Sequence, residues 1–267
     1  MSLTLTAVGY RYVGTSRPAL AGIDLTLAPG EVVGVVGANE AGKSTLCLVA
    51  AGLAPATIGG RLDGAVTVDG LPTAQAHPYE LAQRCGVLFQ NPVTQLSGTA
   101  PTVWEEVAFG PRNLALPLTE VVGRVDDALA ALAIAELAER DPARLSGGQA
   151  QLVALASVLA LRPAYLILDE PTSQLDPQGT RLVGEALSRL VAGGGTGVLL
   201  TEHKTDLLWG LAGRVVVLDG GRAALSGAAH AVLADDRLAA WGVEPPGRVR
   251  LARTAEAAGV ALPELAA

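Results

Sequence analysis

The chain has 267 residues, a formal net charge of −7 and an isoelectric point near 5.0, and its length suits one large α/β domain or two small ones. Half of its residues are hydrophobic, but the longest apolar stretch, residues 152–161, is far shorter than the roughly 20 residues of a membrane-spanning helix. The acidic balance argues against a surface that binds nucleic acid.

The N-terminal third predicts a series of strands joined by Gly- and Pro-rich turns. A β-branched strand at residues 32–36 runs directly into a glycine-containing loop and then an apolar helix that begins near Leu46. Residues 55–64 are Gly-rich and predict irregular structure. The expected strands in this part of the chain are residues 3–12, 19–27, 32–36, 66–70 and 86–90.

From about Val103 to Leu161 the pattern changes to helix. Apolar residues recur near the helical period over residues 120–140, and a mostly apolar helix is expected at 149–161. Beyond it we expect strands at 165–168, 197–201 and 214–218, and a helix at 178–192. The pattern as a whole predicts a parallel α/β sheet interrupted by a helical insert.

Two features indicate the compartment. The N-terminus shows no basic region followed by an apolar run, so we expect no signal peptide. The two cysteines, Cys47 and Cys85, have neither disulfide nor metal-site spacing. We therefore expect a chain that works in a reducing interior.

The most informative stretch is the loop after the strand at residues 32–36. Gly37, Gly42, Lys43 and Ser44 have the spacing G-x-x-x-x-G-K-[ST], which between a buried strand and a helix is the phosphate-binding loop. Glycines allow backbone N–H groups to turn toward a polyphosphate, and the helix N-terminus adds positive partial charge. Lys43 can reach the terminal phosphates and the Ser44 hydroxyl can ligate Mg²⁺.

Two further motifs fit the same chemistry. Asp169 and Glu170 end an apolar strand, where one carboxylate can hold Mg²⁺ and its neighbour can deprotonate the attacking water. Ser146 is expected to cap a helix that begins with Gly147, Gly148 and Gln149. One triphosphate does not need a second anion-accepting helix start, so we expect this loop to close on the nucleotide of a second chain.

In this order, GANEAGKST, LSGGQ and LILDEPT resemble an ATP-binding-cassette (ABC) ATPase over nearly the whole chain. The resemblance implies a P-loop NTPase fold, a mostly parallel sheet with an antiparallel β edge and a helical insert. It also implies an ATPase domain at residues 1–226, with the insert at about 93–161, and a C-terminal helical extension at 227–267.

The resemblance also implies individual roles. Glu170 is the catalytic base, and Asp169 and Ser44 hold Mg²⁺ together with Gln90, which matches the Q-loop. His203 in TEHKTD matches the switch histidine, and Asp176 the D-loop. Tyr12 stacks on adenine, with Tyr10 as a neighbouring rival. ATP is contacted by the phosphate loop and signature motif, that is, by Gly37, Ala38, Asn39, Glu40, Ala41, Gly42, Lys43, Ser44, Thr45, Ser146, Gly147, Gly148 and Gln149.

Within the family, three strings are similar to the ATPases of energy-coupling-factor importers, which take up vitamins and metal ions: FQNPVTQL, PTVWEEVAFGPRNLALP and TEHKTDLL. This similarity implies a homodimer or heterodimer with a second ATPase chain, and no nucleic acid. It also implies a membrane T-component and a substrate-binding subunit at the cytoplasmic face of the membrane. We expect Glu105 and Glu106 to anchor the membrane partner.

The sequence departs from the family pattern at three places. Glu40 stands inside the phosphate loop where glycine is usual, Leu152 replaces an arginine three residues after LSGGQ, and Val93-Thr94 replace an acidic pair. We expect Glu40 to adopt a positive φ and to direct its carboxylate outward. Either it is tolerated with a mild affinity penalty, or it contacts the opposite chain of a dimer.

Two other functional classes remain. A soluble cassette ATPase acting on DNA or ribosomes would carry coiled-coil inserts, zinc motifs or duplicated cassettes, and none is visible in the sequence. A small-molecule phosphotransferase would have no role for the LSGGQ helix. Co-purification with a hydrophobic membrane subunit separates the transport ATPase from both.

Overall fold

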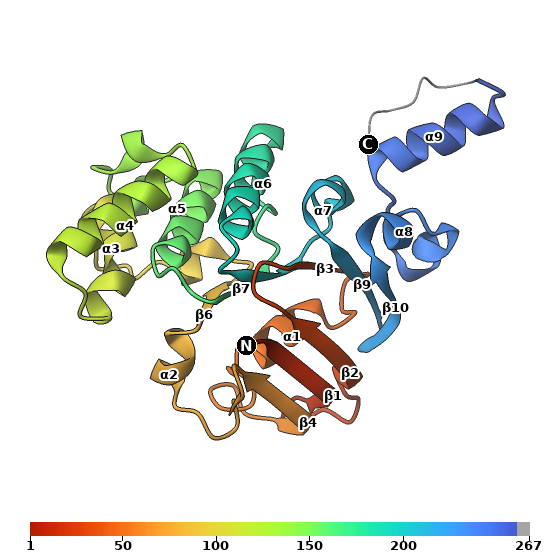
Figure 1. Cartoon of the computed structure of the whole chain (residues 1–267), viewed down its shortest axis with the longest axis horizontal. Coiled ribbons are helices and arrows are strands. Elements are labelled where there is room, and N and C mark those ends of the chain that lie inside the picture. The colour runs from red at the N-terminus through yellow and green to blue at the C-terminus, as the bar shows by residue number, and fades with distance from the viewer. Residues whose placement is uncertain (261–267) are drawn as a thin grey trace.

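Two β-sheets form the framework of the molecule, a computed structural model that describes residues 1–260 (Figure 1). The larger sheet contains β3 (Val32–Val36), β6 (Cys85–Leu88), β7 (Tyr165–Asp169), β8 (Gly197–Thr201), β9 (Arg214–Asp219) and β10 (Arg222–Ala228). Its order is β10-β9-β3-β8-β7-β6, and all neighbours are parallel except β10 with β9. The predicted mostly parallel sheet with an antiparallel edge is therefore confirmed.

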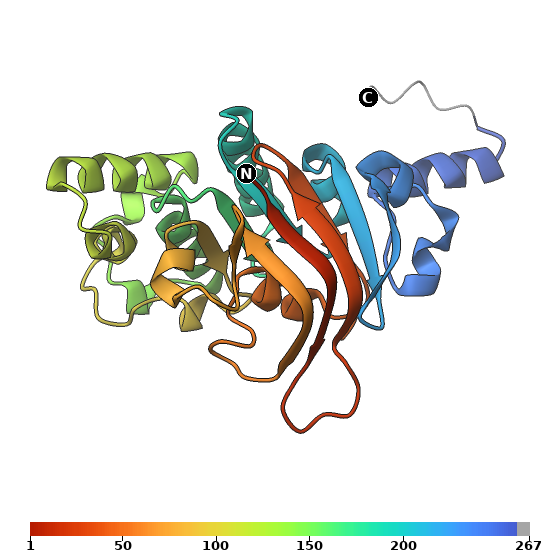
Figure 2. The same cartoon turned by 60° about the horizontal axis from the view of Figure 1, so that its bottom comes forward.

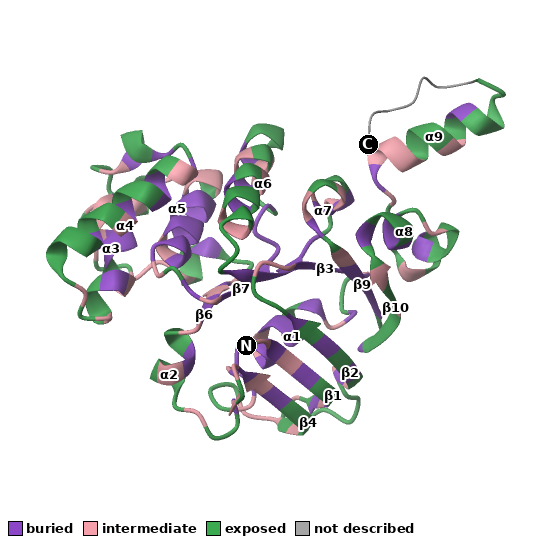
Figure 3. Cartoon of the chain, viewed as in Figure 1, coloured by how far each residue is buried: buried purple, intermediate pink, exposed green. Residues whose placement is uncertain are grey.

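The smaller sheet is antiparallel and has the order β2-β1-β4-β5. Its strands are β1 (Leu3–Arg11), β2 (Leu20–Leu27), β4 (Arg61–Val68) and β5 (Leu71–Pro72). Every residue of β3, β7 and β8 is buried, whereas β1 and β2 alternate between buried and exposed positions (Figure 3). This difference follows from layering, because a parallel sheet is covered on both faces and an antiparallel sheet can leave one face in water.

The helices flank the larger sheet, with one group at each end. Figures 1 and 2 show α3, α4 and α5 beyond the β6 edge, and α8 and α9 beside β10. The helices are α1 (Lys43–Ala50), α2 (Pro78–Ala82), α3 (Val103–Asn113), α4 (Leu118–Ala131), α5 (Gly147–Leu159), α6 (Pro177–Ala192), α7 (Thr205–Leu211), α8 (Ala229–Leu233) and α9 (Gly247–Ala257). The 3-10 turns are η1 (Pro92–Thr94), η2 (Ala135–Leu137), η3 (Pro142–Arg144) and η4 (Asp236–Trp241).

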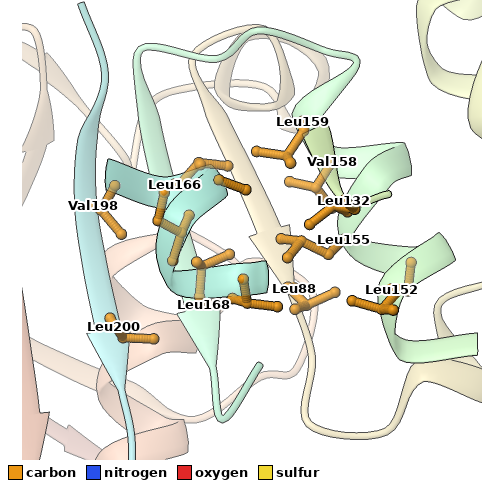
Figure 4. Close-up of a cluster of buried hydrophobic side chains, with 14 of the residues drawn as sticks. Leu88, Leu132, Leu152, Leu155, Val158, Leu159, Leu166, Leu168, Val198 and Leu200 are labelled. Atoms are coloured by element: carbon orange, nitrogen blue, oxygen red, sulfur yellow. The ribbon is translucent and has the colours of Figure 1, made fainter. Parts of the chain in front are cut away.

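Hydrophobic residues form two core clusters on opposite faces of the larger sheet. Along β7, Leu166 and Leu168 pack into the cluster with α3 to α6, while Tyr165 and Ile167 pack into the cluster with α1 and the small sheet. Figure 4 shows the first cluster, in which Leu88 of β6 meets side chains of α5. This packing holds the carboxyl ends of β3, β6, β7 and β8 in fixed register.

Several predicted boundaries were wrong. The helix expected over 120–140 ends at Ala131, because Ala133 takes a left-handed backbone (φ 52°) and a 3-10 turn follows. The irregular segment 55–64 contains the start of β4, which pairs with β1. The strand expected at residues 214–218 is followed by one more strand, β10, at the edge of the sheet. At the start of β4 and in β10, pairing with a neighbouring strand outweighs a weak local pattern.

The C-terminal helices pack against α7. The Trp209 ring stacks on His230 of α8 with centroids 4.3 Å apart, and the Arg248 guanidinium of α9 lies 5.4 Å from the centre of the same ring. The predicted boundary after residue 226 falls inside β10, and residues 261–267 of the predicted extension lie outside the described residues. Within residues 1–260, no helix combines the length and hydropathy of a membrane span.

Candidate nucleotide-binding site

A cavity of about 500 Å³ opens at the carboxyl ends of β3, β6 and β7. It brings together Tyr12 of the small sheet, the loop after β3, Gln90 after β6 and Glu170 after β7. In parallel α/β sheets, ligands bind at this edge. The residues lining the cavity are Tyr12, Ala19, Asn39, Glu40, Gly42, Lys43, Ser44, Thr45, Gln90 and Glu170, and all of them except Ala19 were predicted from the sequence.

The loop backbone requires glycine at two positions. Gly37 has φ 156° and Gly42 has φ 107°. A Cβ at Gly37 would lie 2.4 Å from the Leu218 carbonyl oxygen, and a Cβ at Gly42 would lie 2.8 Å from that of Ala19. Both distances are below any real contact, so only glycine allows the loop to curl against β9 and the small sheet.

Lys43 is buried and points back into the loop. Its Nζ donates to the carbonyl oxygens of Gly37 and Ala38 at 3.0 Å each, and lies 4.0 Å from Glu170 Oε1. Burial lowers the pKa of Lys43, while the nearby carboxylates of Glu170 and Asp169 oppose that shift. The ammonium group is thus held inside the loop, where it can bind the phosphates of a polyphosphate.

Two adjacent acids at the end of β7 have different surroundings. Asp169 is buried, and the Thr201 hydroxyl donates to its Oδ1 at 2.6 Å. Glu170 has a positive φ of 50°, and its Oε2 accepts a bond from Gln90 Nε2 at 2.9 Å. A left-handed glutamate costs on the order of 1 kcal/mol, and such strain clusters at functional sites.

His203, which follows β8, completes this group. Its Nε2 lies 3.0 Å from Glu170 Oε1, and its side chain is 45% exposed. Gln90, Glu170 and His203 come from three loops far apart in the sequence, and the structure brings all three together. A base placed among these polar groups has its orientation fixed before substrate arrives.

The signature loop and Asp176 lie elsewhere. None of Ser146, Gly147, Gly148 and Gln149 lines the cavity. Instead, Ser146 caps α5, and its hydroxyl accepts a bond from the Gln149 N–H. Asp176 caps α6 and accepts from the Gly179 N–H at 2.7 Å. Within one chain, neither motif contributes to the cavity around Lys43.

Tyr12 and Tyr10 are distinguished by burial. Tyr10 is 1% exposed and its hydroxyl donates to the Gly59 carbonyl, so its ring is not free for a ligand. Tyr12 is half-buried, lines the cavity, and has its hydroxyl 3.0 Å from Thr45 Oγ1. Of the two rivals, only Tyr12 offers a ring face to a base.

Comparison with known protein families is decisive. The family model described as "ABC transporter" matches residues 20–173, more than half of the chain. The chain belongs to the ABC transporter family. It is an ATPase, the ATP-binding and ATP-hydrolysing subunit of a transporter.

Relatives and solved structures agree with this assignment. The energy-coupling factor transporter ATP-binding protein EcfA of Methanosarcina acetivorans is 40% identical over 262 residues, which cover 98% of this chain and 92% of the relative. The structure of cbiO1 from Clostridium perfringens, part of the ABC transporter complex cbiONQ, aligns with a TM-score of 0.77 at 31% identity and covers 97% and 98% of the two chains. The dimeric cassette MJ0796 bound to ADP and Pi aligns with a TM-score of 0.75 at 25% identity and covers 86% and 99%.

The ATPase offers oxygen ligands that suit Mg²⁺. The exposed Ser44 hydroxyl, the Asp169 carboxylate and the Gln90 amide are all hard oxygen donors, which Mg²⁺ prefers. Among residues 1–260, no three His, Cys, Asp or Glu side chains gather to hold a metal by themselves.

Glu40 adopts the backbone that its position predicts. Its φ is 63° and its side chain is exposed on the rim of the cavity. The Glu40 side chain thus lines the cavity while exposed to solvent, so its negative charge is close enough to oppose a triphosphate.

Replacing Glu40 with glycine is expected to tighten ATP binding about two- to fivefold, because a screened charge at this range contributes up to about 1 kcal/mol. Glu40→Gln is the matched control, since it removes the charge and keeps a side chain at positive φ. Calorimetry with ATP and size-exclusion chromatography should show similar gains for both variants and unchanged ATP-driven dimerisation. Loss of that dimerisation in both variants would instead indicate a contact across the dimer.

One prediction about the insert needs correction. Glu106 is 4% exposed, and both of its carboxylate oxygens accept bonds from Ser97, from the backbone N–H at 2.7 Å and the hydroxyl at 2.6 Å. It is an internal brace and cannot anchor a partner. Glu105 is half-buried and its carboxylate accepts a bond from the Thr102 hydroxyl. The expected acidic anchor is therefore wrong for Glu106.

Leu152, which departs from the family pattern, has a simple place in the fold. It is 9% exposed and packs in the core cluster near Leu88 and Leu155 (Figure 4). A leucine there adds apolar burial between α5 and β6, so its removal from water is favourable.

Three polar residues near the site were missed by sequence reasoning. Thr201 donates to Asp169 and accepts from the Glu170 N–H. Glu202 is 2% exposed, and the Lys204 ammonium donates to the Thr172 carbonyl oxygen. The only signal for them was their place beside His203 at a strand end, where functional side chains collect.

The two cysteines are both free and buried. Burial raises the pKa of the Cys85 thiol to about 12 and raises that of Cys47 as well. Neither thiol is positioned as a nucleophile, because the thiolate is the reactive form.

Proposed function

We propose that this ATPase is the energising subunit of an energy-coupling-factor importer for a vitamin or metal ion. The observation that carries the proposal is the extent of similarity. The EcfA relative and cbiO1 cover 98% and 97% of the chain, whereas the general family match ends at residue 173. The likeness thus includes the C-terminal segment with α8 and α9, whereas the dimeric cassette MJ0796 covers 86% of this chain.

In the proposed mechanism, the loop amides from Gly37 to Thr45 and the Lys43 ammonium bind the phosphates of ATP. When bound, Mg²⁺ would neutralise charge on the phosphates, with Ser44, Asp169 and Gln90 as the residues that hold it. Thr201 keeps Asp169 in place by its 2.6 Å hydrogen bond.

Glu170 is the proposed general base. Its carboxylate takes a proton from the attacking water, and Gln90 and His203 hold its two oxygens at 2.9 Å and 3.0 Å. His203, being exposed, can also reach a γ-phosphate. Tyr12 is the proposed stacking partner of adenine.

The signature loop supports a dimer. Because Ser146 to Gln149 lie outside the cavity of their own chain, we infer that they complete the site of a second ATPase chain. Every motif for ATP is present in this chain, so a homodimer would have two competent sites. A heterodimer with a sibling chain uses the same geometry.

The helical insert is the proposed contact with the membrane T-component at the cytoplasmic face, where a substrate-binding subunit joins. Val93 on η1 is 69% exposed and Phe109 on α3 is 50% exposed. Large apolar side chains exposed on the surface of the insert are suited to a hydrophobic partner. Because Glu106 is buried, these apolar side chains and Glu105 are the parts of the insert proposed to meet the partner.

Co-purification with a membrane partner tests this function. The chain would be co-expressed with candidate T-component and substrate-binding subunits, and the complex captured in detergent. Phe109→Asp is expected to reduce capture at least about tenfold, because a buried charge without a partner is costly. Ile58→Asp, an equally drastic change at a side chain 43% exposed and remote from the insert, should not.

Soluble ATPase activity should be unchanged in both variants. If the wild-type chain captures no membrane subunit, the soluble-cassette alternative gains ground. If Phe109→Asp and Ile58→Asp behave alike while the complex forms, the complex stands and the proposed surface is wrong.

A further inference from the structure

Both neighbours of His203 are held by polar contacts that ATP binding does not require. Glu202 is 2% exposed, and its Oε1 accepts bonds from the backbone N–H groups of His203 and Lys204 at 2.8 and 3.1 Å. Its Oε2 accepts a bond from the Thr172 hydroxyl at 2.5 Å. The segment that carries His203 is thus tied to the segment that follows Glu170.

Lys204 makes a second tie to the same segment. Its Nζ donates to the carbonyl oxygens of Thr172 and Leu175 at 2.8 and 2.9 Å, and to Thr180 Oγ1 at 2.9 Å. An ammonium group has three N–H donors, and all three find an oxygen. Few lysine side chains are satisfied so completely by protein groups alone, since the strongly hydrated ammonium normally faces water.

The choice of lysine at this position is specific. Lys43 and Lys204 are the only lysines among the 19 lysine and arginine residues of the chain. A compact ammonium can direct three donors at oxygens on different sides, whereas the planar guanidinium of arginine directs its donors in one plane. The three acceptors around Lys204 belong to two turns and a helix, an arrangement that suits lysine.

The segment that Lys204 holds, residues 172–175, links Glu170 to the signature loop at the start of α5. It begins beside Glu170, whose carbonyl accepts a bond from the Ser173 N–H, and Leu175 N–H closes the next turn on Thr172. Gln174, in the middle, lies against the start of α5: a Cβ at Gly147 would be 2.4 Å from Gln174 Oε1, and one at Gly148 would be 3.3 Å from the Gln174 carbonyl oxygen. Figure 1 shows α5 and α6 side by side on this face.

We propose that Lys204 is a positioning residue that fixes the signature loop through residues 172–175. Its ammonium group holds these turns in one conformation, and they in turn fix the start of α5 by contact with Gly147 and Gly148. Lys204 follows His203 directly, so a shift of His203 moves the signature loop. This inference rests on the proposed function, because the signature loop acts on the nucleotide of a second chain.

Loss of the Lys204 side chain should affect two properties of the enzyme differently: ATP binding by a single chain and closure of two chains. Lys204 does not line the cavity around Lys43, so its loss should leave ATP binding to a single chain intact. The same loss should impair closure of two chains, which needs the signature loop in place. A residue with only a general stabilising role would change neither property selectively.

The test compares four full-length proteins: wild type, Lys204→Met, Lys204→Arg and Arg181→Met. Methionine keeps the length of the side chain and removes its donors. Arg181 is exposed on α6, one residue after Thr180, and controls for loss of one positive charge on this face. For each protein, ATP affinity of the monomer, kcat, KM, the Hill coefficient and ATP-driven dimerisation of a Glu170→Gln version would be measured.

Lys204→Met is expected to lower kcat at least about tenfold, to bring the Hill coefficient to about 1 and to abolish the ATP-driven dimer, while ATP affinity changes less than about twofold. Lys204→Arg should recover only part of kcat, because it restores the charge and not the three-way geometry. Arg181→Met should match wild type.

Wild-type behaviour of Lys204→Met in kcat and dimerisation would overturn the inference, and so would a loss of ATP affinity equal to the loss of kcat. If Lys204→Met does not fold, Thr180→Val, which removes one of the three acceptors, should lower kcat and dimerisation in the same direction. A wild-type chain that shows no ATP-driven dimer would instead count against the proposed function.

Discussion

Replacing Glu170 with glutamine is expected to preserve ATP binding, to slow hydrolysis by about 10²–10⁴-fold and to trap an ATP-bound dimer. Glutamine keeps the shape of the side chain and can still accept the bond from Gln90, which now measures 2.9 Å to Oε2. It cannot take a proton from water. Since the barrier rises only in the chemical step, ATP should accumulate in the closed state.

Phosphate release and size-exclusion chromatography with and without Mg-ATP would measure both effects. Glu139→Gln, at an exposed glutamate of the helical insert, is the matched control and should behave as wild type. A Glu170→Gln protein that turns over normally would show that another group activates water. A protein that remains monomeric with ATP would argue against the proposed dimer.

Removing the Lys43 side chain as Lys43→Ala is expected to weaken ATP binding at least about tenfold and to abolish turnover. Lys43 Nζ is held 3.0 Å from two loop carbonyls and is 4.0 Å from Glu170 Oε1, in a buried position. A charge-assisted bond to phosphate in such a site is stronger than one in water. Alanine also leaves the Glu170 carboxylate without its nearest cation.

Calorimetry with ATP at constant Mg²⁺ would measure the affinity, and thermal unfolding would show whether the fold survives. Arg112→Ala, which removes an exposed positive charge from α3, controls for the change in net charge. ATP affinity equal to that of wild type in a folded Lys43→Ala protein would exclude the loop as the main phosphate site.

Local patterns predicted the elements whose sequence carries its own physical reason. The phosphate loop is one continuous stretch of sequence. Its glycines at 37 and 42 are needed because the backbone there has a positive φ, as a strand-loop-helix of this kind requires. Buried strands such as β7 and β8 are short apolar runs with a single plausible structure. The order of the motifs also indicated the family before any contact was visible.

Long-range contacts decided the rest. β10 is rich in alanine and mostly exposed, and it exists as a strand because β9 offers a partner edge. The sequence around Glu106 is typical of an exposed first turn of helix. In the fold, however, the Ser97 N–H and hydroxyl donate to its two carboxylate oxygens. One sequence alone does not show which residues of different segments lie close in space. Hydrogen bonds between such segments therefore cannot be predicted from it.

The sequence by itself determined that this protein binds ATP, which residues form its phosphate loop and which acid follows the buried strand, because each depends on neighbours within a few positions. Only the tertiary structure decided that Gln90 and His203 meet on Glu170, and that Lys204 bonds to the turns at Thr172 and Leu175. The physical reason is that these contacts arise where the parallel sheet aligns the ends of strands distant in the chain. Packing of the two core clusters, and not any local propensity, holds those ends together.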